Sequence, residues 1–178
     1  MARRETAARR YADAAFEIGR ADGTLEVWER DLATLRTALG DEQLRRLVEH
    51  PAVPFAEKEK VLRRVVEGVS TEPLSLALLM VRRGRPGAID AMVERFAELV
   101  RQERGISLAE VRTARPLDEA QRTAVTQRLR ELTGDKIEMK EVVDDALIGG
   151  ISVRIGDRLY DASVRSRLER LRARLTAV

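Results

Sequence analysis

Apolar residues recur at steps of three and four along roughly the first hundred positions, a spacing that predicts successive amphipathic helices. The clearest helix carries Leu25, Trp28, Leu32, Leu35 and Leu39 and stops at Gly40. The same pattern, with the turn residues between the stripes, predicts five more helices at about 5–20, 41–50, 55–69, 73–83 and 89–104. Stripes of this kind pack together as an all-α bundle.

After Gly105 the period of the apolar residues changes. Residues 106–113 and 137–143 are predicted to form strands, and the segment between them that starts at Asp118 is predicted to form a helix. Asp118 and Gln121 have the spacing of a capping box. This part of the chain therefore belongs to a mixed α/β fold.

The run from Leu147 to Val164 predicts a β-hairpin followed by a final helix. Ile151, Val153 and Ile155 alternate with polar residues, and Gly156-Asp157 supplies a two-residue turn. Asp161 or Ser163 can cap the helix. The apolar stripe of that helix is Val164, Leu168, Leu171 and Leu175.

These patterns predict a mainly α protein with two domains. Residues 1–105 form an N-terminal six-helix bundle, and residues 106–178 form a small α/β C-terminal domain that ends in a helix.

The fifth predicted helix is unusual because it has almost no polar face. A peripheral helix of a bundle normally keeps one, so this helix is either central or covered by another chain. Small residues line the first helix beside Tyr11 and Ile18, and they would let another helix approach closely. The two helices could form a groove for an amphipathic partner helix, and burial of the fifth helix inside the fold explains its pattern equally well.

Composition narrows the class of protein. The chain has 178 residues, of which 44% are apolar and 35% charged, as in folded globular proteins. Its longest apolar stretch is far shorter than the roughly 20 residues that cross a bilayer. There is no cysteine, so packing alone must stabilise the fold. The N-terminus is rich in alanine and arginine but lacks a secretory signal, and we interpret it as mature protein.

Charge and candidate chemistry argue against catalysis. His50 is the only histidine and precedes a proline at a helix end, where a surface role is expected. Asp144-Asp145 are interpreted as turn residues, and Gly149-Gly150 as a bend or close backbone contact, since these glycines precede a strand. We therefore expect no enzyme, no cofactor and no metal site.

The C-terminal arginines have three interpretations. The net charge is only +3 and aromatic residues are 3%, which is not typical of a nucleic-acid-binding protein. A solvated face opposite the leucine stripe is favoured, and an acidic protein partner or nucleic acid are the alternatives. The arginines are Arg165, Arg167, Arg170, Arg172 and Arg174.

From end to end, the sequence resembles the delta subunits of rotary F-type ATP synthases, the oligomycin-sensitivity-conferring protein family. The C-terminal signature is Ile148-Gly149-Gly150-Ile151-Ser152-Val153-Arg154-Ile155-Gly156, then Asp161-Ala162-Ser163-Val164. Arg10-Tyr11-Ala12-Asp13-Ala14-Ala15-Phe16 is similar to the family's opening, and His50-Pro51 with Lys58 is similar to its turn before a helix. Gly19 departs from the pattern, because a helix former such as alanine would be typical there.

The resemblance implies a non-catalytic stator subunit of the peripheral stalk. Such a subunit ties the catalytic head to the b-subunit stalk, so that rotation and hydrogen ion transport are coupled to ATP synthesis or hydrolysis. It lies at the cytoplasmic face of the bacterial plasma membrane without inserting into it. The alternatives are a nucleic-acid-binding adaptor that uses the arginine-rich C-terminal helix and a small helical enzyme with an unrecognised site.

The resemblance also implies two partner sites. The N-terminal helix of the alpha subunit is expected between helices one and five, and the C-terminal end of the b subunit at the final helix. The expected alpha-subunit groove is Ala8, Tyr11, Ala12, Ala15, Ile18, Leu74, Ala77, Leu78 and Val81, and the expected stalk contact is Val164, Leu168, Leu171 and Leu175.

Overall fold

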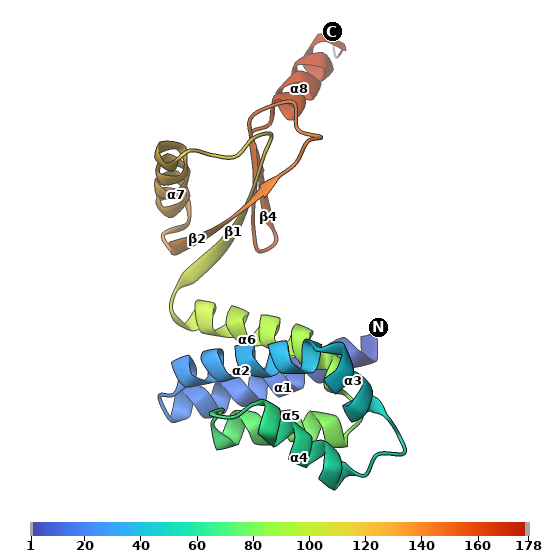
Figure 1. Ribbon diagram of the computed structural model, residues 1–178. Coiled ribbons are helices and arrows are strands. Elements are labelled where there is room, and N and C mark those ends of the chain that lie inside the picture. The colour runs from blue at the N-terminus through green and yellow to red at the C-terminus, as the bar shows by residue number, and fades with distance from the viewer. Residues whose placement is uncertain (1, 177–178) are drawn as a thin grey trace. The chain divides into compact units, whose positions relative to one another are not determined.

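The computed structural model of the chain describes the backbone of residues 2–176 and the side chains of residues 6–169 and 172. It contains two compact units, Met1–Val100 and Arg101–Val178. Helices dominate, and the second unit adds a small mixed sheet (Figure 1). The mainly α character expected from the sequence is confirmed.

The first unit is helical. Its elements are α1 (Ala2–Ala21), α2 (Leu25–Gly40), α3 (Glu42–Glu49), α4 (Phe55–Val65), α5 (Thr71–Arg82), the short 3-10 helix η1 (Pro86–Ala88) and α6 (Ile89–Glu103). Asp41 caps α3 as expected, accepting from the amides of Gln43 and Leu44. The largest differences from the predicted bounds are in two helices. Helix α1 begins earlier, at Ala2, and α4 ends at Val65, so that Val66 and Val69 pack onto the core from the turn that follows.

Aromatic side chains join three helices at the centre of this unit. The Phe96 ring of α6 stacks against Trp28 of α2 at 6.2 Å between centroids, and its edge meets Phe16 of α1 at 6.5 Å. Gly19 explains how α1 and α2 come so close. A Cβ at that position would lie 2.9 Å from Cδ1 of Trp28, so the departure from alanine makes room for the indole.

A buried carboxylate connects α2 to the start of α5. Asp31 is 2% exposed, and its Oδ2 accepts from the backbone N–H of Ser70 at 2.8 Å. Ser70 precedes the first turn of α5, and its side chain makes no capping hydrogen bond to that turn. Burial works to raise the pKa of Asp31, but hydrogen bonds from Ser70 and Arg30 outweigh it and hold the pKa below the ordinary value of 3.8.

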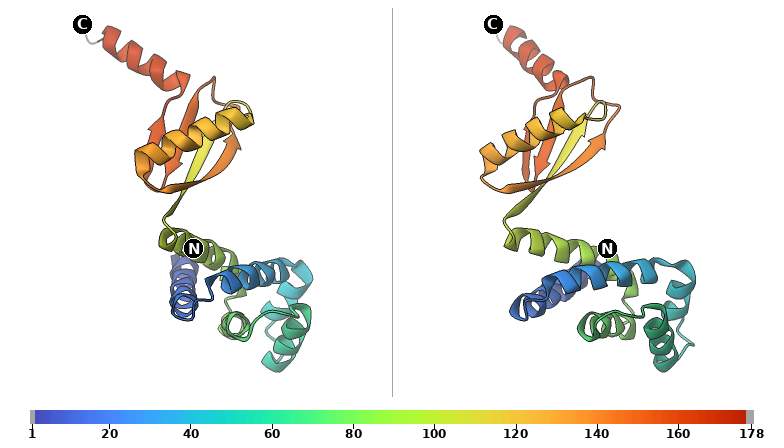
Figure 2. Two further views of the ribbon diagram at one scale, coloured as in Figure 1. Left: turned by 90° about the vertical axis from the view of Figure 1, so that its left-hand side faces the viewer. Right: turned by 60° about the vertical axis from the view of Figure 1, so that its left-hand side comes forward.

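The second unit contains β1 (Ile106–Thr113), α7 (Glu119–Thr133), β2 (Lys136–Val143), β3 (Ile151–Ile155), β4 (Arg158–Asp161) and α8 (Val164–Thr176). The sheet order is β2-β1-β3-β4, with β1 parallel to β2 and antiparallel to β3. The helix α7 covers one face (Figure 2). The core on that face is Ala109, Val111, Leu129, Ile137 and Val153.

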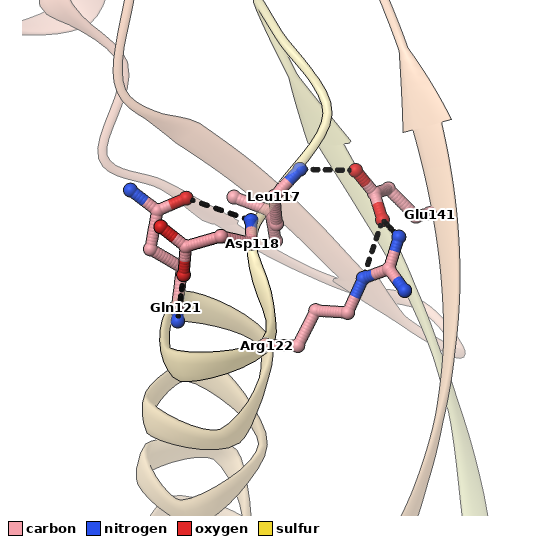
Figure 3. A network of polar contacts seen from close by, with 5 residues as sticks. All are labelled: Leu117, Asp118, Gln121, Arg122 and Glu141. Atoms are coloured by element: carbon pink, nitrogen blue, oxygen red, sulfur yellow. Dashed lines mark hydrogen bonds and ion pairs between the residues drawn. The ribbon is translucent and has the colours of Figure 1, made fainter.

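The start of α7 is fixed to the sheet by two connected sets of hydrogen bonds (Figure 3). Asp118 and Gln121 form the predicted capping box. Glu141 of β2 accepts from the backbone N–H of Leu117 at 2.7 Å and pairs with Arg122 at 2.8 Å. The bond from Leu117 is the main reason why the pKa of Glu141 lies below its usual value, since burial opposes the shift and Arg122 adds to it.

Replacing Gly19 by alanine is expected to destabilise the protein, although alanine is the better helix former by about 1 kcal/mol. The added methyl must displace Trp28 in a packed core, where overpacking costs about 1–3 kcal/mol. Urea unfolding followed by circular dichroism measures the change. In a Trp28→Phe background the same substitution should cost less, and a cost that stays unchanged there would refute the proposed contact.

Replacing Asp31 by alanine is expected to lower the free energy of unfolding by about 1–3 kcal/mol, because the N–H of half-buried Ser70 loses its acceptor. The folded pKa is depressed, so this contribution is present above pH 3.8 and is lost as the pH falls through the folded pKa. Urea unfolding at neutral and acidic pH should show the difference from wild type shrinking in acid. Asp90→Ala, which removes a solvent-exposed ion pair with Arg36, is the control and should cost less than about 1 kcal/mol.

Candidate protein-interaction site

Within the described residues, no group of three or more His, Cys, Asp or Glu side chains could hold a metal ion. His50 is exposed at the end of α3, and its Nδ1 accepts from the backbone N–H of Ala52 at 3.2 Å. Asp144 likewise accepts from the N–H of Ala146 at 3.0 Å. His50 therefore lies on the surface at a helix end, and Asp144 belongs to a turn, as the sequence predicts. None of the described helices is long and apolar enough to cross a membrane.

The apolar side chains of α5 mostly point into the unit's own core. Leu74, Ala77, Leu78 and Val81 are buried together with the other core residues, and Leu78 is only 6% exposed. Burial inside the fold therefore accounts for these four apolar residues of the helix. These four predicted groove residues support the bundle and are not accessible on its surface.

The small-residue stripe of α1 is also internal. Ala8, Ala12 and Ala15 are buried in the same core, and α1 contacts α5. Alanine at these positions lets neighbouring helices pack closely. Of the predicted groove residues, the accessible ones are half-buried Tyr11 and Ile18, which is 44% exposed.

Some apolar side chains of α1 and α5 remain partly or largely accessible. They are Tyr11 and Ile18 on α1, and Leu76 and Leu79 on α5. Leu79 is 41% exposed although its neighbour Leu78 is buried. Leu76 and Leu79 are not among the groove residues predicted from the sequence, and a run of apolar residues gives no signal that separates them from the buried ones.

The Gly149-Gly150 pair positions the start of α8. A Cβ at Gly150 would lie 2.6 Å from the carbonyl oxygen of Ala162, and this glycine has φ +81°. Two backbone hydrogen bonds of 3.0 Å join the same segments, from Val164 N–H to the Gly149 carbonyl and from Ala162 N–H to the Ile151 carbonyl. The expected close backbone contact is confirmed, and only glycine satisfies both of its requirements.

Both candidate caps take part at the N-terminus of α8. Ser163 is buried, and its Oγ accepts from the N–H of Ser166 at 3.2 Å. Asp161 accepts from the N–H of Ser163 at 2.9 Å and from the Ser166 hydroxyl. Ser163 is therefore the capping residue, and Asp161 supports it.

The two described members of the apolar stripe of α8, Val164 and Leu168, are not part of the sheet core. Val164 and Leu168 are exposed, Leu168 by 55%, and α8 extends beyond the sheet without lying on either face (Figures 1 and 2). Ile148, beside the glycine pair, is 71% exposed and was missed by the sequence analysis. The side chains of Leu171 and Leu175 lie outside the described residues.

The described structure thus has the features of a protein-binding module, with exposed apolar side chains on each of its two units. A sequence model of the ATP synthase delta (OSCP) subunit family matches residues 7–175. The chain is 39% identical over 173 residues to "ATP synthase subunit delta" of Salinibacter ruber, covering 96% of this chain and 90% of that protein. It is 37% identical to "ATP synthase subunit delta" of Caulobacter vibrioides, covering 93% and 92%.

Among solved structures, a chain of the Toxoplasma gondii mitochondrial ATP synthase hexamer superimposes with a TM-score of 0.69 at 26% identity, covering 96% of this chain and 98% of that one. The chain belongs to the ATP synthase delta (OSCP) subunit family. It is a peripheral-stalk component of the stator and is not catalytic. Nothing in these comparisons supports the nucleic-acid-binding alternative.

Replacing Gly150 by alanine is expected to destabilise the second unit and disturb the start of α8, because the methyl group meets the Ala162 carbonyl. Gly134→Ala is the matched control: Gly134 has φ +78°, but nothing lies within 4 Å of its Cβ position. Both variants incur the cost of about 1–3 kcal/mol for a left-handed alanine, and only Gly150→Ala adds the clash. Urea unfolding compares the two, and an equal loss of stability would contradict the close-approach explanation.

Proposed function

We propose that this chain joins the catalytic head to the stalk through one partner site on each unit. Residues 1–105, taken as a six-helix bundle, bind the N-terminal helix of the alpha subunit. Residues 106–178 bind the C-terminal end of the b subunit. Family membership supports the stator role, and the apolar side chains that remain exposed on each unit are the observation that supports two sites.

The head-binding surface is defined here as Tyr11, Ala14 and Ile18 of α1 with Leu76 and Leu79 of α5. On α1, the opposite flank is already occupied by α6, since Asp13 lies 3.8 Å from Arg95 and Phe16 contacts Phe96. Tyr11 and Ile18 therefore lie on the flank away from α6. A partner helix can contact them without displacing any helix of the bundle.

The geometry of α5 supports the same surface. One flank of α5 faces α4, because the Arg82 guanidinium lies 5.8 Å from the centre of the Phe55 ring. Leu76 lies on the other flank and Leu79 points outward. Figure 2 shows α5 between α1 and α4, so the flank of α5 away from α4 is on the side of α1.

The buried residues of the predicted groove have a supporting role in this proposal. Ala8, Ala12 and Ala15 let α1 pack closely, and Leu74, Ala77, Leu78 and Val81 anchor α5. Their packing sets the separation of the two helices and hence the shape of the head-binding surface. They position the partner helix without touching it.

For the stalk, we assign the contact to the exposed stripe of α8. Val164 and Leu168 are the described members, and Leu171 and Leu175 continue the spacing. In the assembled complex the chain would lie at the cytoplasmic face of a bacterial plasma membrane. The bacterial relatives and the absence of a membrane-spanning helix among the described residues are consistent with this location.

Two binding sites also help to supply the binding free energy that a stator subunit needs. A stator joint that survives many turnovers needs nanomolar affinity, or about 12 kcal/mol. Burying one large apolar side chain contributes about 2 kcal/mol before the costs of association, so the few exposed side chains of either surface fall short alone. Because head and stalk belong to one assembly, attachment at one site keeps the other partner at high effective concentration, and the chain is retained more firmly than by either surface alone.

The head-binding surface predicts that Leu79→Asp or Ile18→Asp weakens capture of an alpha-subunit N-terminal peptide by tenfold or more, equivalent to about 1.4 kcal/mol. The reason is that a carboxylate would be desolvated against the bound helix. Calorimetric titration of the full chain with the peptide measures the affinity. Reconstitution with the separated head, which should bind one copy of the chain, tests the function directly.

Leu132→Asp is the matched control, because Leu132 is an exposed leucine on α7 in the other unit. Its peptide affinity should equal that of the unmodified chain. Leu78→Asp should instead unfold the bundle, since it places a charge in the core. Unchanged affinity in both Leu79→Asp and Ile18→Asp would exclude the head-binding surface as defined.

A further inference from the structure

The apolar stripe of α8 has the spacing of a seven-residue repeat over slightly less than two heptads. Its members are separated by four, three and four positions, which is the a/d spacing of a coiled coil. Leu168 and Leu175 occupy a positions, and Val164 and Leu171 occupy d positions. Such a repeat favours pairing with another helix along a narrow seam.

Arginine occupies each position that flanks this seam. The e and g positions are Arg165, Arg167, Arg172 and Arg174. Arg165 and Arg167, whose side chains are described, are exposed. In this heptad register Arg170 takes a c position, away from the seam. The register therefore assigns the other four arginines to the two borders of the leucine stripe.

This charge pattern selects the partner. The thirteen residues of α8 contain five arginines and one glutamate. Two copies of α8 would place arginine against arginine along both borders, which opposes self-association. A helix with acidic residues at its own e and g positions would instead gain ion pairs along the seam.

The attachment of α8 shows why a partner is needed. Val164 and Leu168 are exposed, and α8 is joined to the sheet by the backbone bonds and the cap at its first turn. An isolated helix of thirteen residues is only marginally stable in water. The close contact at Gly150 fixes where the helix starts, and a partner that packs on the exposed Val164 and Leu168 would stabilise it further.

We propose that α8 is one strand of a heterotypic coiled coil, and that its partner is an acidic amphipathic helix with Asp or Glu flanking its apolar seam. The inference rests on the proposed stalk contact, and it specifies the chemistry of the helix that the stalk must present. Ile148, exposed next to the base of α8, extends the apolar contact beyond the first turn.

The test uses the full chain and two synthetic heptad peptides with leucine at a and d, one with Glu and the other with Lys at e and g. The acidic peptide should bind and raise the helix content, its affinity should fall as salt is added, and the basic peptide should not bind. Arg167→Glu should weaken binding of the acidic peptide about tenfold, whereas Arg170→Glu, with the same charge change on the far side, should change it less than about threefold.

A fourfold Arg→Glu variant at positions 165, 167, 172 and 174 should reverse the preference and bind the basic peptide. Equal binding of the two peptides, binding of neither, or equal weakening by Arg167→Glu and Arg170→Glu would overturn the coiled-coil inference.

The b subunit is titrated in parallel with the peptides. If the b subunit binds the chain and Arg167→Glu leaves that affinity unchanged, the inference fails while the proposed function stands. If the acidic peptide behaves as expected but the b subunit does not bind, the proposed stalk contact fails instead.

Discussion

In both units, one segment of backbone lies so close to a neighbouring group that a side chain larger than glycine would not fit between them. In the first unit, Gly19 admits the indole of Trp28 between α1 and α2, and the alanines of α1 allow close helix packing. In the second, Gly150 admits the carbonyl of Ala162 and so fixes the first turn of α8. Glycine and alanine bury little surface themselves. They stabilise the fold by letting larger groups pack closely against the backbone.

Secondary structure could be predicted well because each helix, strand or turn is specified by residues close together in the sequence. The capping box of α7, the cap of α3 and the hairpin turn all follow from residues a few positions apart. The link between Asp31 and Ser70 could not be predicted, since the two residues lie 39 positions apart and neither has an unusual local pattern. Such long-range polar contacts depend on how the helices pack.

The candidate site was harder to predict for a different reason. In α5, Leu78 is buried and Leu79 is exposed, yet they are the same residue type in one apolar run. Hydrophobicity indicates that a helix is buried but not which flank stays free once its neighbours are in place. Which flank stays exposed depends on where α4 and α6 pack, and their packing leaves Tyr11, Ile18 and Leu79 accessible. On α8 the polar residues indicate the kind of partner. Arginine beside the apolar stripe favours an acidic partner helix, whereas the stripe alone would accept any apolar helix face.

The stacked pair of Trp28 and Phe96 gives this protein an optical signal confined to one unit. Trp28 is the chain's only tryptophan, and it is buried where α1, α2 and α6 meet. Its emission therefore follows the folding of the helical unit alone, whereas far-ultraviolet circular dichroism follows both units. When the two signals are recorded during one denaturation, coincident transitions would indicate a single cooperative molecule, and separate ones would give each unit its own stability.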